Sequence, residues 1–359
     1  MLLVNLNSIK GILLLSIFLF TFNSLLANPA GEDNTDPIYV NASASGNNDG
    51  SSWENAFTNL HDAISLAKEG DRTKIVVAKG IYYTTSGSDR SKSFDLSNVN
   101  GLQFLGGFNG DEEEPSNRNN NFWQTHQTIL SGEIGDPQTK EDNSYHVINA
   151  ENAKGLYIDG FYVEDGYADG PGNLRHGAGM ILTNSSSGSG AAIHKCHFRN
   201  NHAANGDGGA IYLEKVFCNI VNSFFSHNVS RGDGGAICYK GKGYANLRNC
   251  YFRFNSSTQE EGGAVAAFGE GITLSFCELY QNVAKNGASI YQGKNNFLFV
   301  EYSTFVQNGT ADIATNSVRT RGEAVIRNSI FWNDSKNPPS IFNDGDLSLT
   351  YSIVQGGFS

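Results

Sequence analysis

Three nine-residue segments decide the fold: residues 193–201 read IHKCHFRNN, residues 220–228 read IVNSFFSHN, and residues 247–255 read LRNCYFRFN. Each begins with an aliphatic residue, has Cys or Ser at its fourth position and ends in Asn. The template continues less strictly through four further copies, whose fourth positions are Cys277, Ser303, Ser329 and Ser352. These positions are spaced by 27, 27, 27, 26, 26 and 23 residues. Such a period indicates a solenoid in which each repeat forms one coil.

Within each copy, a large apolar residue follows the Cys or Ser by two positions, which is the alternation of a β-strand. Since the copies are in register, we expect equivalent strands to stack in parallel about 4.8 Å apart around a shared core. The expected core column is Phe198, Phe225, Phe252, Leu279, Phe305, Phe331 and Val354. The five cysteines, an odd number, then suggest stacked buried thiols more than a disulfide framework.

Two kinds of turn residue also recur once per copy. An asparagine column at Asn201, Asn228, Asn255, Asn282 and Asn308 predicts a ladder at a turn. Asparagine suits this place because it tolerates the left-handed backbone region and its amide can bond to the next coil. The glycosylation sequons at three of these positions are explained by the ladder without glycosylation. Glycine pairs at 208–209, 234–235 and 262–263 predict tight corners.

The predicted fold is all-β: a right-handed, single-stranded parallel β-helix of roughly eleven coils with an N-terminal capping helix. Seven coils come from the copies above, and four from residues 75–77, 103–105, 129–130 and 157–158. The step from Ile158 to Ile193 is longer, 35 residues, and predicts an extra loop around residues 167–176. A β-sandwich is the structural alternative.

The chain divides into three predicted parts. Residues 1–27 have the basic residue, short apolar core and small residues of a signal peptide, and no later segment is apolar enough for a transmembrane helix. Residues 28–72 hold a strand and, over residues 52–67, an amphipathic helix that we expect to cap the core. Residues 73–359 form the β-helix, which we expect to be truncated because the last repeat stops just after its strand.

The net charge and the predicted location limit the classes of binding partner. The chain has 25 Lys and Arg against 36 Asp and Glu, a net charge of −11, so it lacks the basic surface that nucleic-acid binding requires. Export predicts a secreted or extracellular protein. A polysaccharide or cell-surface glycan is the partner class that we expect.

The sequence resembles the repeats of the chlamydial polymorphic outer membrane protein family, which pair GGA-(I/L/V) with F-x-x-N. The matching segments are 208–211, 234–237 and 262–265, together with 198–201, 225–228, 252–255 and 305–308. The start of the chain, through residues 39–40, Trp53 and 77–82, looks like that of secreted bacterial proteins with the pectate-lyase-like fold. Both resemblances imply a parallel β-helix, and the first implies adhesion at the outer membrane.

Candidate chemistry rests on acidic residues in turns. Asp207, Asp233 and Glu261 precede successive glycine pairs and should stack along one edge, and Asp169 lies near the extra loop. These four are the weak candidates for catalysis, since hydrolysis needs two carboxylates about 5 to 9 Å apart. Asp165, Arg175 and His176 are the weak candidates for ligand binding. No cofactor is predicted, although stacked carboxylates raise the prospect of calcium.

The function favoured by the sequence is adhesion or glycan binding at a cell surface without catalysis. The alternatives are a polysaccharide lyase or glycoside hydrolase with a lateral groove near residues 165–176, and a structural spacer. A tyrosine strip for stacking sugars is disfavoured, because Tyr212, Tyr239 and Tyr291 lie at different offsets of the repeat. These residues are expected in the core or at its rim.

Overall fold

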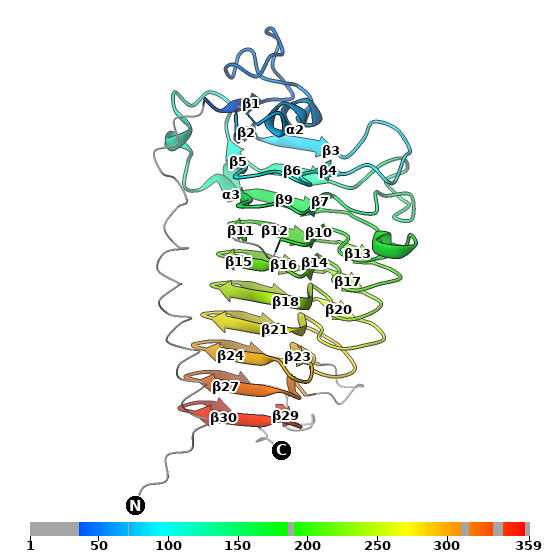
Figure 1. Cartoon of the computed structure of the whole chain (residues 1–359), viewed down its shortest axis with the longest axis vertical. Coiled ribbons are helices and arrows are strands. Elements are labelled where there is room, and N and C mark those ends of the chain that lie inside the picture. The colour runs from blue at the N-terminus through cyan, green and yellow to red at the C-terminus, as the bar shows by residue number, and fades with distance from the viewer. Residues whose placement is uncertain (1–35, 71, 186–189, 310–315, 333–339, 356–359) are drawn as a thin grey trace, which may run out of the picture. The chain divides into compact units, whose positions relative to one another are not determined.

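The chain coils into a parallel β-solenoid, with strands recurring as successive rungs along one axis (Figure 1). The computed structural model describes residues 36–70, 72–185, 190–309, 316–332 and 340–355. The predicted signal peptide, residues 1–27, lies outside the described residues. Neighbouring rungs pair in parallel, as in Phe198 with Phe225 and Ile193 with Ile220, which excludes the β-sandwich alternative.

The largest sheet consists of two ladders that merge at the long strands β18 (Ile237–Arg248) and β21 (Val265–Ser275). The remaining strands of the first ladder are β4 (Phe94–Asp95), β7 (Ile148–Glu151), β10 (Met180–Thr183), β14 (Ile211–Glu214), β23 (Ile290–Gln292), β26 (Val318–Thr320) and β29 (Ile341–Asn343). Those of the second ladder are β1 (Ile38–Val40), β2 (Lys74–Ala78), β5 (Gln103–Phe108), β8 (Tyr157–Asp159), β11 (Ala191–His194), β15 (Phe217–Val221), β24 (Phe297–Glu301), β27 (Glu323–Arg327) and β30 (Asp346–Thr350).

A ten-stranded sheet forms a second wall, and a small three-stranded sheet adds a third. The ten-stranded sheet consists of β3 (Gly80–Tyr83), β6 (Thr128–Ser131), β9 (Phe161–Glu164), β12 (His197–Arg199), β16 (Phe224–Ser226), β19 (Tyr251–Arg253), β22 (Glu278–Tyr280), β25 (Thr304–Val306), β28 (Ile330–Trp332) and β31 (Ile353–Val354). The small sheet consists of β13 (His202–Ala203), β17 (Val229–Ser230) and β20 (Ser256–Ser257).

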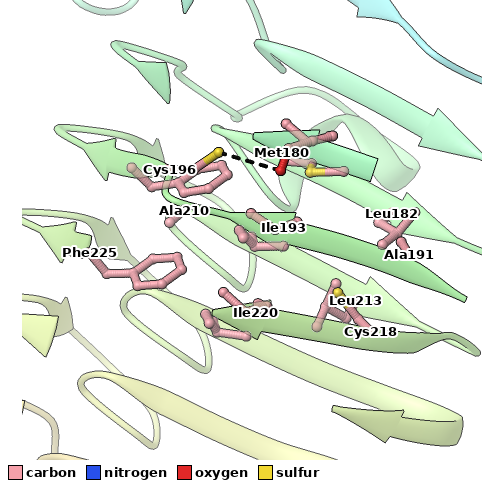
Figure 2. Packing of buried hydrophobic residues seen from close by; sticks show 14 of the residues in the cluster. Met180, Leu182, Ala191, Ile193, Cys196, Ala210, Leu213, Cys218, Ile220 and Phe225 are labelled. Atoms are coloured by element: carbon pink, nitrogen blue, oxygen red, sulfur yellow. Dashed lines mark hydrogen bonds between the residues drawn. The ribbon is translucent and has the colours of Figure 1, made fainter. Parts of the chain in front are cut away.

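The predicted core column is confirmed. Its members pair in register from Phe198 to Val354 through seven successive strands of the ten-stranded sheet. The rings of Phe225 and Phe252 stack with centroids 4.8 Å apart. Ile193 and Ile220 lie on successive strands of the same interior (Figure 2). The five cysteines are buried and free. The predicted stacking of thiols holds for Cys250 on Cys277, whereas Cys218 and Cys238 pair with other residue types on the neighbouring strands.

The asparagine ladder and the predicted bonding of its amides to the next coil are confirmed, but the predicted left-handed backbone at the asparagines is wrong. Asn228 donates from Nδ2 to Asn255 Oδ1 at 3.0 Å, and Asn255 donates in the same way to Asn282. The residue with positive φ is the one before each asparagine, for example His227 at 56° and Phe254 at 58°. The ladder therefore depends on amide hydrogen bonds, and left-handed backbone is required of its neighbours.

The number of coils is about ten, because the ten-stranded sheet has one strand per coil. The predicted count of roughly eleven coils is one too high, because residues 129–130 do not begin a coil of their own. They belong to β6 in the ten-stranded sheet, whereas Phe104 of β5 pairs directly with Ile158 of β8. One coil therefore takes 54 residues and includes the short helices η1 (Pro115–Asn117) and α3 (Phe122–Thr125).

The long step from Ile158 to Ile193 arises at two places. Compared with the next coil, four residues are added between Val163 and Met180, where η2 (Gly172–Arg175) lies, and four more between Met180 and Ile193. The predicted loop at 167–176 thus accounts for half of the extra length.

The N-terminal helix, α2 (Leu60–Lys68), begins later than predicted. The Asn59 side chain caps its start by accepting from the His61 N–H, so residues 52–58 lie outside it. Trp53 instead contacts the ring of Tyr39, with centroids 4.8 Å apart. Leu60 and Ile64 join the main core cluster. The capping role of this helix stays a prediction.

Candidate functional site

The three acidic turn residues form one hydrogen-bonded ladder. Asp207 Oδ1 accepts from the backbone N–H of Asp233 at 2.8 Å, and Asp233 Oδ1 accepts from the backbone N–H of Glu261 at 3.3 Å. The first glycine after each acid has a φ between 65° and 68°. This left-handed corner turns the chain into the next strand and places the acids one above another.

A basic side chain joins the first two acids. Lys240, at the fourth position of β18, lies with Nζ 2.8 Å from Asp207 Oδ2 and 3.7 Å from Asp233 Oδ2. His176 adds a third contact, with Nδ1 3.2 Å from Asp207 Oδ2. We call Asp207, Asp233, Lys240 and His176 the polar cluster. Lys240 occupies the space between the two carboxylates where a bound cation would need to lie.

The polar cluster lies against apolar side chains outside the main core. Tyr212 and Cys238 are buried next to Ile181, with Phe268 partly buried against them. The Tyr212 ring stacks on His176 with centroids 4.6 Å apart, and Lys240 Nζ lies 5.3 Å from the centroid of the Phe268 ring. The polar cluster is thus shielded from water on one side.

This environment drives the two carboxyl pKa values apart. Burial alone would raise the pKa of Asp207, but the contact with His176 and the charge of Lys240 outweigh it and hold that pKa far below its usual range. Burial, reinforced by the negative charge of Asp207, raises the pKa of Asp233 to about 6. A pair of this kind can hold one ionised and one protonated carboxyl at mildly acidic pH.

Glu261 is bound separately. It accepts from Asn286 Nδ2 at 3.1 Å, and Arg319 donates to Asn286 Oδ1 at 2.9 Å while pairing with Asp344. Burial raises the pKa of Glu261. The third rung of the acid ladder is therefore tied to later coils rather than to Lys240.

The candidates near the extra loop do not converge with the polar cluster, apart from His176. Asp169 pairs with Arg90 at 2.7 Å. Arg175 Nε lies 3.1 Å from His176 Nε2. Asp165 has a φ of 60°, and burial raises its pKa to about 6. Of the residues predicted for ligand binding, only Arg175 and His176 are in contact.

A second polar group, centred on Asp159, was not predicted. Its carboxylate contacts Arg118 at 2.7 Å, His194 Nδ1 at 2.8 Å and the Tyr157 hydroxyl at 3.0 Å. Asn222 Nδ2 lies 3.0 Å from the other ring nitrogen of His194. Both nitrogens of the His194 ring are thus engaged, and Arg118 anchors the long coil to its neighbours.

An aromatic strip runs over the outer face of the ten-stranded sheet and was also missed. We define the aromatic strip as Trp123, Tyr162, His197, Phe224 and Tyr251. Tyr162, His197, Phe224 and Tyr251 occupy the same outward position of four successive strands. The Phe224 and Tyr251 rings stack with centroids 4.7 Å apart and planes 8° apart, and the Trp123 ring stands at 72° to Phe224.

The aromatic strip is partly open to solvent and flanked by charges. Phe224 is 37% exposed, Trp123, His197 and Tyr251 are half-buried, and Tyr162 is buried. The next outward position carries the ion pair of Glu164 with Arg199, and Arg253 pairs with Glu278 at 2.7 Å. The repeat itself signals four members of the strip, since each immediately precedes the buried Phe or Val of its strand; Trp123, from α3, carries no such signal. The three tyrosines considered from the sequence are buried.

The described residues offer few other kinds of site. Among the described residues, no helix is long and apolar enough to cross a membrane, and no cluster of three potential metal ligands occurs. One surface hollow of about 550 Å³ lies beside α2 and β3. It is lined by Thr58, Asn59, Ile81, Tyr83, Ser86 and Lys92, among others.

Comparison with known proteins identifies the repeats. Residues 195–214 and 222–240 match the family model described as the Chlamydia polymorphic membrane protein repeat. These segments contain the Phe and Asn columns, two glycine corners and, in Asp207, Asp233 and Lys240, most of the polar cluster. No curated protein and no solved structure matches the chain.

Proposed function

We propose that this protein is a non-catalytic adhesin of a bacterial cell surface, and that the aromatic strip is the part of its lateral face that binds glycan or another surface ligand. The observation that carries the proposal is the row of outward-facing rings on four successive strands. Solvent-exposed aromatic groups that are ordered by a rigid scaffold supply large contact area at low entropic cost.

Two further observations support it. The chain contains polymorphic membrane protein repeats, which favours association with the outer membrane or cell surface. The charged pairs beside the rings, such as Arg253 with Glu278, offer hydrogen-bond donors and acceptors at the rim. A polar rim around an apolar centre is the usual arrangement of a binding surface.

The test compares two double variants that each remove a stacked Phe–Tyr pair. The first is Phe224→Ser with Tyr251→Ser in the aromatic strip. The matched control is Phe276→Ser with Tyr302→Ser, whose rings stack 5.0 Å apart at a different part of the surface. Binding is measured on a glycan array and on host or bacterial cells.

The first variant should lose about tenfold or more in apparent affinity, since exposed aromatic contacts contribute on the order of 1–2 kcal/mol. The control should bind like the parent protein. Equal loss in both, or in neither, would refute the assignment of binding to the aromatic strip.

One observation supports the enzyme alternative. The pKa of Asp207 is lowered whereas that of Asp233 is raised. A lyase or hydrolase would release unsaturated products or reducing ends from acidic or neutral polysaccharides, with or without calcium. We expect no turnover, because Lys240 and His176 already bind the Asp207 carboxylate. Turnover that disappears in Asp207→Asn would instead establish catalysis.

A further inference from the structure

The polar cluster contains the groups that amide formation between side chains requires. The nucleophile, Lys240 Nζ, lies 2.8 Å from Asp207 Oδ2. The second carboxyl, Asp233, lies 3.7 Å from the same nitrogen. The other oxygen of Asp207, Oδ1, accepts from the Asp233 backbone N–H at 2.8 Å. We propose that Lys240 and Asp207 condense to an intramolecular amide that cross-links two neighbouring coils, with the Asp233 side chain as proton relay.

The step is balanced without an oxidant or any second reactant. Lys240 passes a proton to Oδ2 of Asp207, its hydrogen-bond partner, so that a neutral amine attacks Cγ of a neutral acid. The N–Cγ bond forms, and the Cγ–Oδ2 bond breaks. Two protons from the nitrogen, one of them carried by Asp233, leave with Oδ2 as water. One ammonium and one carboxylate become a neutral amide, so the net charge is unchanged.

Several features of the surroundings support this reaction, with the ion pair as its starting state. The negative charge that develops on Oδ1 during attack faces a backbone N–H that is already in place, which is the role of an oxyanion hole. The Asp207 side chain is 12% exposed, and the amide removes two charges whose desolvation is costly. Fixed geometry converts a slow bimolecular condensation into an intramolecular one. The pKa of Asp233, raised by burial to about 6, suits a group that both takes and gives a proton.

Another ion pair of this chain lacks these features and serves as the internal control. Lys68 Nζ lies 2.7 Å from Asp95 Oδ2, a similar distance, but the Asp95 side chain is 51% exposed. No second carboxyl is paired with Lys68 in the described residues. Contact between a lysine and an aspartate is therefore not enough for amide formation, and we expect the Lys68–Asp95 pair to remain ionic.

The amide would connect a turn to a strand of the next coil. Asp207 lies in the corner before β14, whereas Lys240 lies in β18, and these strands are neighbours in the first ladder. In an adhesin, tension along the chain would peel coils apart one by one. A covalent bond between coils would resist that separation. This inference does not depend on which ligand the aromatic strip binds.

Intact-mass spectrometry of the purified chain tests the proposal directly. After incubation at about pH 6, the main species should be lighter than the sequence mass by one water. Lys240→Arg, which keeps the charge but cannot form this amide, and Asp233→Asn, which removes the relay, should retain the full mass. Asp207→Asn should lose ammonia in place of water, because its leaving group is an amine. Lys68→Arg should lose water like the parent protein.

Peptide mapping identifies the bond. Asp207 and Asp233 each precede glycine, and an Asp–Gly succinimide would also lose one water. The proposal requires a branched tryptic peptide that joins the two segments through Lys240 and is stable to hydroxylamine. Full mass in the folded parent protein, water loss that persists in Lys240→Arg, or a map that shows only succinimide would each overturn it. Circular dichroism confirms that each variant is folded.

Discussion

Replacing one rung of the asparagine ladder tests the main structural conclusion. Asn255 is fully buried and makes four side-chain hydrogen bonds. Its Nδ2 donates to Asn282 Oδ1 and to the Phe225 carbonyl, and its Oδ1 accepts from the backbone N–H and from Nδ2 of Asn228. Asn255→Ala removes all four bonds. Asn282 Oδ1 keeps the bond from the backbone N–H of residue 255, and Asn228 Nδ2 keeps the Phe198 carbonyl, whereas the Asn228 backbone N–H and the Phe225 carbonyl lose these partners.

The loss of stability follows from the number of buried polar groups that lose a hydrogen-bond partner. A buried donor or acceptor that loses its partner costs at least about 1 kcal/mol, so the free energy of unfolding should fall by about 2 kcal/mol or more. Chemical denaturation monitored by tryptophan fluorescence measures the change. The control is Asn249→Gly, which removes an exposed asparagine with a φ of 51° and a single side-chain bond to Asn222. A loss below about 1 kcal/mol in Asn255→Ala, or one equal to the control, would refute the conclusion that the ladder stabilises the solenoid.

Four further predictions concern particular side chains. In a Lys240→Arg background, which cannot form the amide, Asp233→Asn should stabilise the protein at neutral pH and have little effect at pH 4. The raised pKa of Asp233, about 6, means that its ionisation at higher pH disfavours folding; a pH series of denaturation midpoints measures this. Asp207→Asn should do the opposite, since the lowered pKa of Asp207 contributes stability that is present at neutral pH and lost only as pH falls through the folded-state value. Phe254→Asn should raise the free energy of unfolding by about 1 kcal/mol, because the ring is exposed and its φ is 58°; a decrease would show that its stacking on His227 matters more. Thiol reagents should label none of the five buried cysteines in the native protein and all five after unfolding, and native labelling would contradict their burial.

The sequence predicts the regular part of the solenoid because each coil there repeats the same physical solution. Phe198, Phe225 and Phe252 can share one column only if every coil has the same length, so their spacing alone determines the register. Residues 129–130 have a similar apolar pattern but lie in a different sheet. With no fixed period around them, nothing local distinguishes the two walls of the core.

The contacts of the candidate sites were less predictable than their positions. The spacing of Asp207, Asp233 and Glu261 predicts that they stack, and they do. The spacing does not predict that Lys240, an outward-facing residue of a strand, contacts Asp207. Nor does it predict the contact of His176, which lies in the lengthened coil. Arg118 reaches Asp159 from the longest coil of all. The repeat cannot predict contacts with residues that lie in irregular segments.

The locations of the two candidate sites follow from the same geometry. Inward positions of the repeat are uniform because neighbouring coils must pack together, whereas outward positions are free to vary. The aromatic strip uses this freedom on the ten-stranded sheet, over the coils of β9, β12, β16 and β19. The polar cluster uses it at the glycine corners, where Asp207 and Asp233 belong to the two segments that match the family repeat. Since Lys240 ends the second of these segments and Asp207 lies in the first, their contact needs two consecutive repeats. A single repeat, however well formed, could supply neither the row of rings nor the contact between Lys240 and Asp207.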